Sequence, residues 1–71
     1  MEQYEYLANA IVLRAAADYR IASRRLTVNP EYPPARQLES DCEQFFLSGW
    51  FAVLTNVNGA ALLERLREEA Q

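Results

Sequence analysis

The sequence of 71 residues contains no histidine, no lysine and a single cysteine. A disulfide framework within one chain is excluded because Cys42 is the only thiol, and a lone cysteine among apolar residues is typical of a small buried side chain in a reducing compartment. Without histidine, the hydroxyl and thiol side chains lack the base that most often activates a nucleophile. The sequence therefore favours a protein that is not an enzyme, and we expect no catalytic residue, no cofactor, no metal ion and no small-molecule substrate.

Long apolar runs are also missing, and glycine is scarce. No apolar stretch approaches the about 20 residues that span a bilayer, and the start MEQYEY carries acids where a secretory signal carries basic residues. The composition, with 51% hydrophobic residues, 24% charged residues and only two glycines, is that of a globular chain and not of a disordered one. We expect residues 1–71 to form one soluble domain in the cytoplasm, without contact to a membrane.

The first part of the chain predicts a long helix. Apolar residues recur there at spacings of three and four, which places them on one face of a helix over residues 4–27. They are Tyr4, Leu7, Ala8, Ile11, Ala15, Tyr19, Ala22 and Leu26. The pair Asn29-Pro30 ends this helix, because proline disfavours the helical conformation of the residue before it and lacks the N–H for the next hydrogen bond. Residues 28–33 are then a connector.

A second helix is predicted over residues 34–47. Pro34 suits its first turn, since the missing N–H is no loss at that position. The apolar stripe of this helix consists of Leu38, Cys42, Phe45 and Phe46. The carboxylates of Glu39, Asp41 and Glu43 are expected to point outward, with no cleft around them.

Two further helices follow, each with a capping residue. Ser48 is a suitable N-cap for a short helix over residues 49–54, and Asn58 is a suitable N-cap for a last helix over residues 59–70. The expected fold is therefore all-α, a small bundle of three main helices with a short extra helix between the second and the third.

The segment FFLSGWF, residues 45–51, holds half of the aromatic side chains of the protein. Each large ring buries on the order of 150–250 Å², so a chain of this size cannot leave all of them in water. Neighbouring residues point about 100° apart on a helix, however, and one face cannot hold both members of an adjacent pair. We expect most of the cluster in the core and part of it at a partner contact, with Trp50 and Phe51, together with Leu13 and Ile21 of the first helix, as the partner-binding residues.

Asp18 lies close to the centre of the apolar face of the first helix, where an unpaired carboxylate is costly. Arg14, one turn earlier, is its nearest partner, while Arg36 and the Trp50 indole N–H are alternatives from other helices. A structural role for Asp18 and Arg14 follows, and replacement of Asp18 by alanine is expected to lower the stability by about 1–3 kcal/mol because a partner loses its bond.

Charge is segregated along the chain. Residues 14–25 contain four arginines and one acid, whereas residues 31–44 contain four acids and one arginine, so the two blocks could pair in the fold. Alternatively, Arg20, Arg24 and Arg25 at the end of the first helix could contact nucleic-acid phosphates, with an affinity that falls steeply with salt. The net charge of −3 argues against this alternative.

Three stretches carry a resemblance to a known group: AAADYRIASRRLTVNP, an acid before FF, and FFLSGWFAVLTNVNGAALLERL. From about Ile11 to Leu66 the chain resembles small uncharacterised proteins of phages, prophages and mobile elements of clostridia and other Firmicutes. The matching positions are Asp18-Tyr19-Arg20, Asn29-Pro30, Phe45-Phe46, Ser48, Trp50-Phe51, Leu54-Thr55 and Gly59. Asn56 and Asn58 differ, because that group tends to carry aspartate there. The group has no assigned activity, so the resemblance implies a genetic setting and not a mechanism.

Two functions remain after these exclusions. The first is a non-enzymatic accessory protein of the phage or mobile-element type that acts through protein–protein contacts, either with another protein or with a second copy of this chain as a homodimer. The alternative is a small nucleic-acid-binding regulator that uses the arginine-rich end of the first helix.

Overall fold

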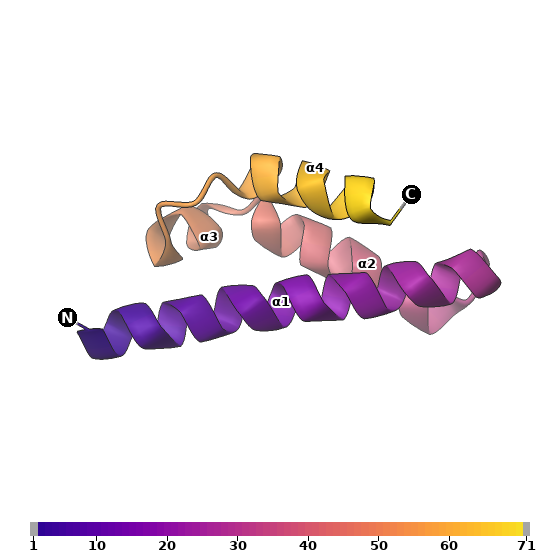
Figure 1. The fold of residues 1–71 in the computed structure, drawn as a ribbon, viewed down its shortest axis with the longest axis horizontal. Coiled ribbons are helices and arrows are strands. Elements are labelled where there is room, and N and C mark those ends of the chain that lie inside the picture. Colours follow the sequence, from indigo (N-terminus) through magenta and orange to yellow (C-terminus); the bar gives the residue numbers. More distant parts are fainter. Residues whose placement is uncertain (1, 71) are drawn as a thin grey trace.

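The structure is a computed structural model that describes residues 2–70, with side chains described from residue 6 onward. The chain forms four helices and, within residues 2–70, no strand (Figure 1). The helices are α1 (Glu2–Val28), α2 (Pro33–Phe46), α3 (Gly49–Leu54) and α4 (Gly59–Glu69). The predicted all-α fold, with three main helices and a short one between the second and third, is confirmed.

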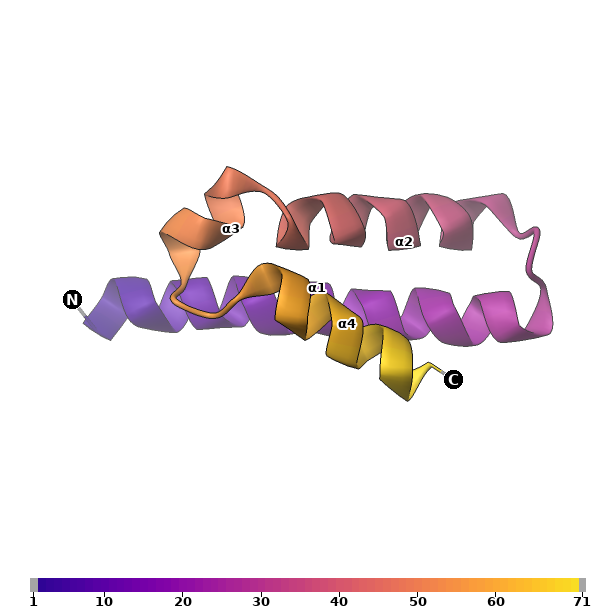
Figure 2. The same ribbon diagram turned by 90° about the horizontal axis from the view of Figure 1, so that it is seen from above.

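The long helix α1 is the base on which the other helices lie. A helix of 27 residues is about 40 Å long at 1.5 Å per residue, close to the longest dimension of the molecule, 42 Å. The helix α2 runs back along the C-terminal half of α1, while α3 lies over the N-terminal half (Figure 2). As a result, the N-terminal turns of α1 extend beyond the end of α2.

The predicted apolar face of α1 is buried along only part of its length. Its central residues are buried, with Tyr19 3% exposed and Ala22 fully buried. By contrast, Leu7 and Ile11, which belong to the same face in sequence, are 56% and 44% exposed. Ile11 still lines a shallow groove with Leu38 and Phe45 of α2, so it lies at the edge of the covered part of α1. The side chain of Tyr4, also predicted on this face, lies outside the described side chains.

A tight turn connects α1 to α2. The Asn29 amide donates to the Arg25 carbonyl at 2.9 Å, and the Tyr32 amide donates to the Asn29 carbonyl at 3.1 Å. The helix α2 begins at Pro33, one residue earlier than expected, since the fixed φ of proline suits a first helical turn.

The aromatic segment supplies the centre of the core. Phe46 and Phe51 are each 1% exposed, and their rings meet edge to face with centroids 5.7 Å apart. Phe45, which is partly buried, meets the Phe51 ring in the same manner at 5.4 Å. These geometries are the favoured ones for aromatic pairs, so three rings of the segment stabilise the junction between α2 and α3.

The start of α4 is pressed against the end of α2. A Cβ atom added to Gly59 would overlap the carbonyl oxygen of Phe46 and would lie 3.0 Å from Cδ1 of Phe51. Glycine is therefore required at this position by the close approach of two backbones. Just before it, the side chain of Asn58 accepts a hydrogen bond of 3.1 Å from the Ala61 amide, which is the expected N-cap.

Candidate interaction surface

The short helix α3 has one buried face and one exposed apolar face. The hydroxyl of Ser48 caps it by accepting a hydrogen bond of 3.2 Å from the Phe51 amide, as the sequence predicts. This orientation turns Phe51 into the core and leaves Trp50 61% exposed and Val53 78% exposed. Leu47 and Val57, which flank the helix in sequence, are also exposed. We refer to Leu47, Trp50, Val53 and Val57 as the α3 surface.

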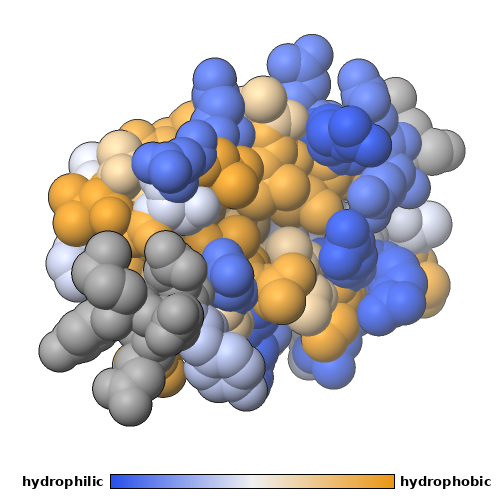
Figure 3. Space-filling view, turned by 60° about the vertical axis from the view of Figure 1, so that its left-hand side comes forward, coloured by the Kyte–Doolittle hydropathy of each residue, from blue (hydrophilic) through white to orange (hydrophobic). Residues whose placement is uncertain are grey.

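Residues 44–63 contain no charged side chain, so the α3 surface arises from an uncharged stretch of sequence. Seen toward the N-terminal end of α1 and α3, hydrophobic residues cover a broad area of the molecule, with hydrophilic residues over and around it (Figure 3). Exposed apolar patches of this kind, with a polar rim, are typical of protein contact sites. An exposed tryptophan at such a patch is the residue type that most often anchors an interface.

The structure corrects one of the predicted partner-binding residues. Phe51 is 1% exposed and packs against Phe45 and Phe46, so it cannot contact a partner in this fold. Its position follows from the Ser48 cap, which sets the rotation of α3. Trp50 is thus the ring of the segment that is available to another molecule.

The two predicted residues of α1 lie on a different face from Trp50. Leu13 is 68% exposed, whereas Ile21 is partly buried. The buried residues Ala16, Tyr19 and Ala22 define the core-facing side of α1. Successive residues of a helix are rotated by about 100° around its axis, and this rotation places Leu13 and Ile21 on another face. The structure therefore separates Leu13 and Ile21 from the α3 surface.

Asp18 is paired, but it is less buried than the helical spacing indicates. Arg14 Nε lies 3.5 Å from Asp18 Oδ1, with 81% of the Arg14 side chain and 33% of the Asp18 side chain exposed. Arg36, an alternative partner, instead contacts Glu31 at 3.3 Å. The pair is an ion pair near the surface, and because exposed pairs contribute about 0.2–1 kcal/mol, the structure lowers the stability cost expected for the loss of Asp18.

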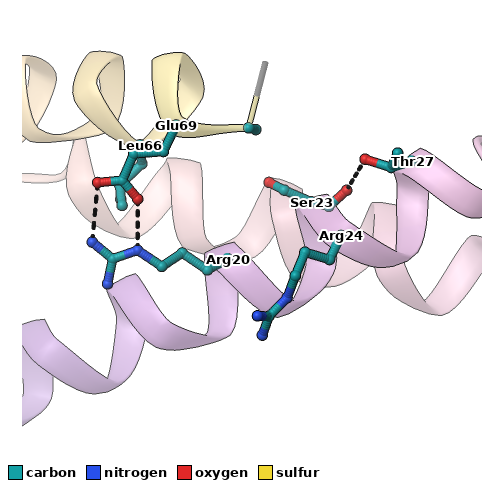
Figure 4. A pocket seen from close by; sticks show the side chains of 7 residues that line it. Arg20, Ser23, Arg24, Thr27, Leu66 and Glu69 are labelled. Atoms are coloured by element: carbon teal, nitrogen blue, oxygen red, sulfur yellow. Dashed lines mark hydrogen bonds and ion pairs between the residues drawn. The ribbon is translucent and has the colours of Figure 1, made fainter.

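Arg20 is held by the last helix. Its Nε and Nη2 atoms donate to the two carboxylate oxygens of Glu69 at 2.8 and 3.2 Å, which is the two-pronged geometry that arginine favours (Figure 4). This contact raises the pKa of Arg20 and lowers the pKa of Glu69. A groove of about 220 Å³ lies beside it between α1 and α4, lined by Ser23, Arg24 and Thr27 among others.

The prediction that the basic block, residues 14–25, pairs with the acidic block, residues 31–44, is wrong. Among the ion pairs of the described residues, none joins the two blocks. Arg20 pairs with Glu69 and Arg14 pairs within its own helix. Arg24 and Arg25 are exposed at the end of α1. Of the three arginines considered for nucleic-acid binding, Arg20 is thus occupied by a carboxylate.

A network that the sequence did not indicate joins three helices. The Tyr19 hydroxyl of α1 donates to Glu43 Oε2 of α2 at 3.1 Å, and Arg67 Nη2 of α4 lies 3.4 Å from the same oxygen. Burial, followed by the hydrogen bond to Glu43, raises the pKa of Tyr19 to about 12. Glu43 was expected to point outward, and this expectation is wrong because the residue contacts both α1 and α4.

Glu39 also differs from the outward orientation predicted for it. It is partly buried, and desolvation together with the neighbouring Glu43 charge raises the pKa of its carboxyl. Only Asp41 of the three carboxylates is exposed, and it accepts a hydrogen bond of 2.8 Å from Gln37. The three acids therefore differ in burial and in the residues that they contact.

Cys42 is buried among the core residues, 6% exposed. Desolvation is the largest cause of the raised pKa of its thiol, followed by the nearby carboxylates. Across residues 2–70, no group of three or more acidic or cysteine side chains is arranged to hold a metal ion. In the same range, none of the helices combines the length and the apolar character that crossing a membrane requires.

Comparison of the chain with protein-family models, with curated proteins and with solved structures gives no match.

Proposed function

We propose that this protein is a non-enzymatic accessory protein that acts by contact with a partner protein at the α3 surface. The observation that carries the proposal is Trp50, which is 61% exposed on a helix whose other aromatic residue, Phe51, is fully buried. Complete burial of a large aromatic residue removes on the order of 150–250 Å² of surface from water, and a partner could cover the 61% of Trp50 that is still exposed. The resemblance to small phage and mobile-element proteins supports an accessory role in such a genetic programme, in the cytoplasm.

Charge favours a protein partner over nucleic acid at this surface. The α3 surface comes from the uncharged residues 44–63, whereas affinity for nucleic acid comes mainly from cations that contact phosphates. At the other end of α1, Glu69 already neutralises Arg20. An apolar surface with a central tryptophan is instead the composition of a protein interface core.

The partner can be identified by photo-crosslinking from the surface itself. A photoreactive phenylalanine analogue at Trp50 is expected to give a discrete adduct in cells, whereas the same analogue at the exposed Glu64 of α4 serves as the matched control. The purified partner should then bind the wild-type chain at least ten times more tightly than the Trp50→Ala variant, because interface tryptophans commonly contribute about 2 kcal/mol or more. Equal crosslinking from both positions, or equal affinity for both chains, would refute the proposal.

A further inference from the structure

The helix α1 carries a second apolar stripe on the side turned away from the core. Its members follow each other at spacings of three and four, so they lie along one face of the helix. They are Tyr6, Ala10, Leu13, Ala17, Ile21, Arg24 and Val28. Tyr6 is 74% exposed, Leu13 is 68% exposed and Val28 is 87% exposed. We refer to these residues as the outer stripe, in which Arg24 is the only charged member.

An ordinary surface helix has polar side chains opposite its buried face. The inner face of α1 is already occupied, because Ala16, Tyr19 and Ala22 are buried in the bundle. The helix is therefore apolar on two sides. Such a helix is typical of a position with packing partners on both sides. In the described part of the chain, six of the seven members of the outer stripe are exposed, and Ile21 is partly buried.

The distribution of charge along α1 indicates what could pack against the outer stripe. Residues 2–13 contain two glutamates and no arginine, whereas residues 19–28 contain three arginines and no acid, and of these arginines Arg20 is paired with Glu69. A second α1 in the opposite direction would place an acidic end beside a basic end at both ends of the contact. Antiparallel packing also opposes the two helix dipoles favourably.

The stripe is symmetric in a way that suits a two-fold contact. Ala17 is at its midpoint, with Leu13 and Ile21 four residues to either side and Tyr6 and Val28 eleven residues to either side. Small residues at the crossing point allow two helices to approach closely, while larger residues on either side interdigitate. In an antiparallel pair centred on Ala17, Leu13 faces Ile21 of the second copy, and Tyr6 faces its Val28.

We propose that two copies of this chain form a homodimer through the outer stripes of α1, antiparallel and centred on Ala17. This inference rests on the proposed function in protein–protein contact, but it uses a face of the molecule other than the α3 surface. The dimer leaves Trp50 of both copies free for a partner, so one assembly would present two α3 surfaces.

The test is the solution mass by size exclusion with light scattering. The wild-type chain should have twice the monomer mass of 8.2 kDa. Ala17→Glu should give a monomer with unchanged helicity, because two like charges would meet at the crossing point. The matched control is Ala60→Glu, the same substitution at an exposed alanine of α4, which should remain a dimer. Trp50→Ala should also remain a dimer.

Orientation and charge can be examined on the same dimer. Labels at Tyr6→Cys of one copy and Val28→Cys of the other should lie close together, whereas two labels at position 6 should lie about 33 Å apart along the helix. Raised salt should weaken the dimer, since the charged ends contribute to it. Close contact between the two labels at position 6 would overturn the antiparallel arrangement.

The remaining outcomes separate this inference from the proposed function. A wild-type monomer throughout the micromolar range would overturn the homodimer and would leave the α3 surface as a binding site. A dimer that is lost in Trp50→Ala and kept in Ala17→Glu would place self-association at the α3 surface and would likewise overturn the inference.

Discussion

Tyr19 and Glu43, which are 24 positions apart in the sequence, are joined by a hydrogen bond of 3.1 Å from the tyrosine hydroxyl to Oε2 of the carboxylate. Arg67 of α4 approaches the same oxygen, so one carboxylate links α1, α2 and α4. The three long helices therefore have a polar attachment in addition to their apolar core.

Replacement of Tyr19 by phenylalanine should lower the stability by about 0.5–1.5 kcal/mol, the usual net contribution of one hydrogen bond. The ring stays in place, so the aromatic contact with Phe46 is kept. Urea unfolding followed by circular dichroism measures the difference. An unchanged midpoint would show that the hydroxyl does not contribute.

The raised pKa of Tyr19 predicts a loss of stability at high pH. The folded-state pKa of about 12 exceeds the ordinary value of 10.0, so the unfolded chain releases this proton first as pH rises. The contribution of Tyr19 is complete below pH 10.0 and is lost as pH rises through about 12. Denaturation midpoints measured between these values should fall more steeply for the wild type than for Tyr19→Phe. Identical pH profiles would contradict the assignment.

The two glycines should respond in opposite ways to alanine. In Gly59→Ala the new Cβ overlaps the Phe46 backbone, and overpacking of this kind costs about 1–3 kcal/mol. In Gly49→Ala no atom lies within 4 Å of the new Cβ. The substitution should raise the stability by up to about 1 kcal/mol, because alanine gives the unfolded chain less conformational freedom than glycine does. Thermal melts of both variants measure the contrast, and equal losses would contradict the close approach of α4 to α2.

Asp18→Ala should lower the stability by less than about 1 kcal/mol, since Arg14, the partner in its ion pair, is 81% exposed. The effect should decrease with added salt because ions screen exposed charges. A loss of several kcal/mol in a chemical denaturation experiment would show that Asp18 has a buried partner.

Cys42 should react with a thiol reagent only when the chain unfolds. The side chain is 6% exposed, and burial raises the pKa of the thiol, which reduces the reactive thiolate at neutral pH. The rate of modification by a disulfide reagent, compared in buffer and in denaturant, tests this expectation. Rapid modification of the folded chain would place the thiol at the surface.

The sequence predicts the helices of this protein well because their signals are local. Pro34 marks the start of α2 to within one residue, and Ser48 and Asn58 cap the helices that follow them. Each of these residues acts on its own backbone or on neighbours within three positions, so the pattern can be read without knowledge of the fold.

The position of individual side chains at the surface depends on contacts between helices, which the sequence does not specify. Leu7 belongs to the apolar face of α1 but is exposed, because the length of α2 decides how far that face is covered. Glu43 is on the polar side of α2 in the sequence. Its structural role comes from the contacts that Tyr19 of α1 and Arg67 of α4 make with its carboxylate. The rotation of α3 about its axis decides that Phe51 is buried and that Trp50 is exposed.

The exposure of the α3 surface is tested by the fluorescence of Trp50, the single tryptophan, in the monomeric Ala17→Glu variant. Because Trp50 is 61% exposed, we expect an emission maximum close to that of tryptophan in water, efficient quenching by acrylamide, and a stability of Trp50→Ala similar to that of the parent. A blue-shifted emission that is protected from the quencher, together with a destabilised Trp50→Ala variant, would place the ring in the core. That result would contradict the α3 surface as a binding site.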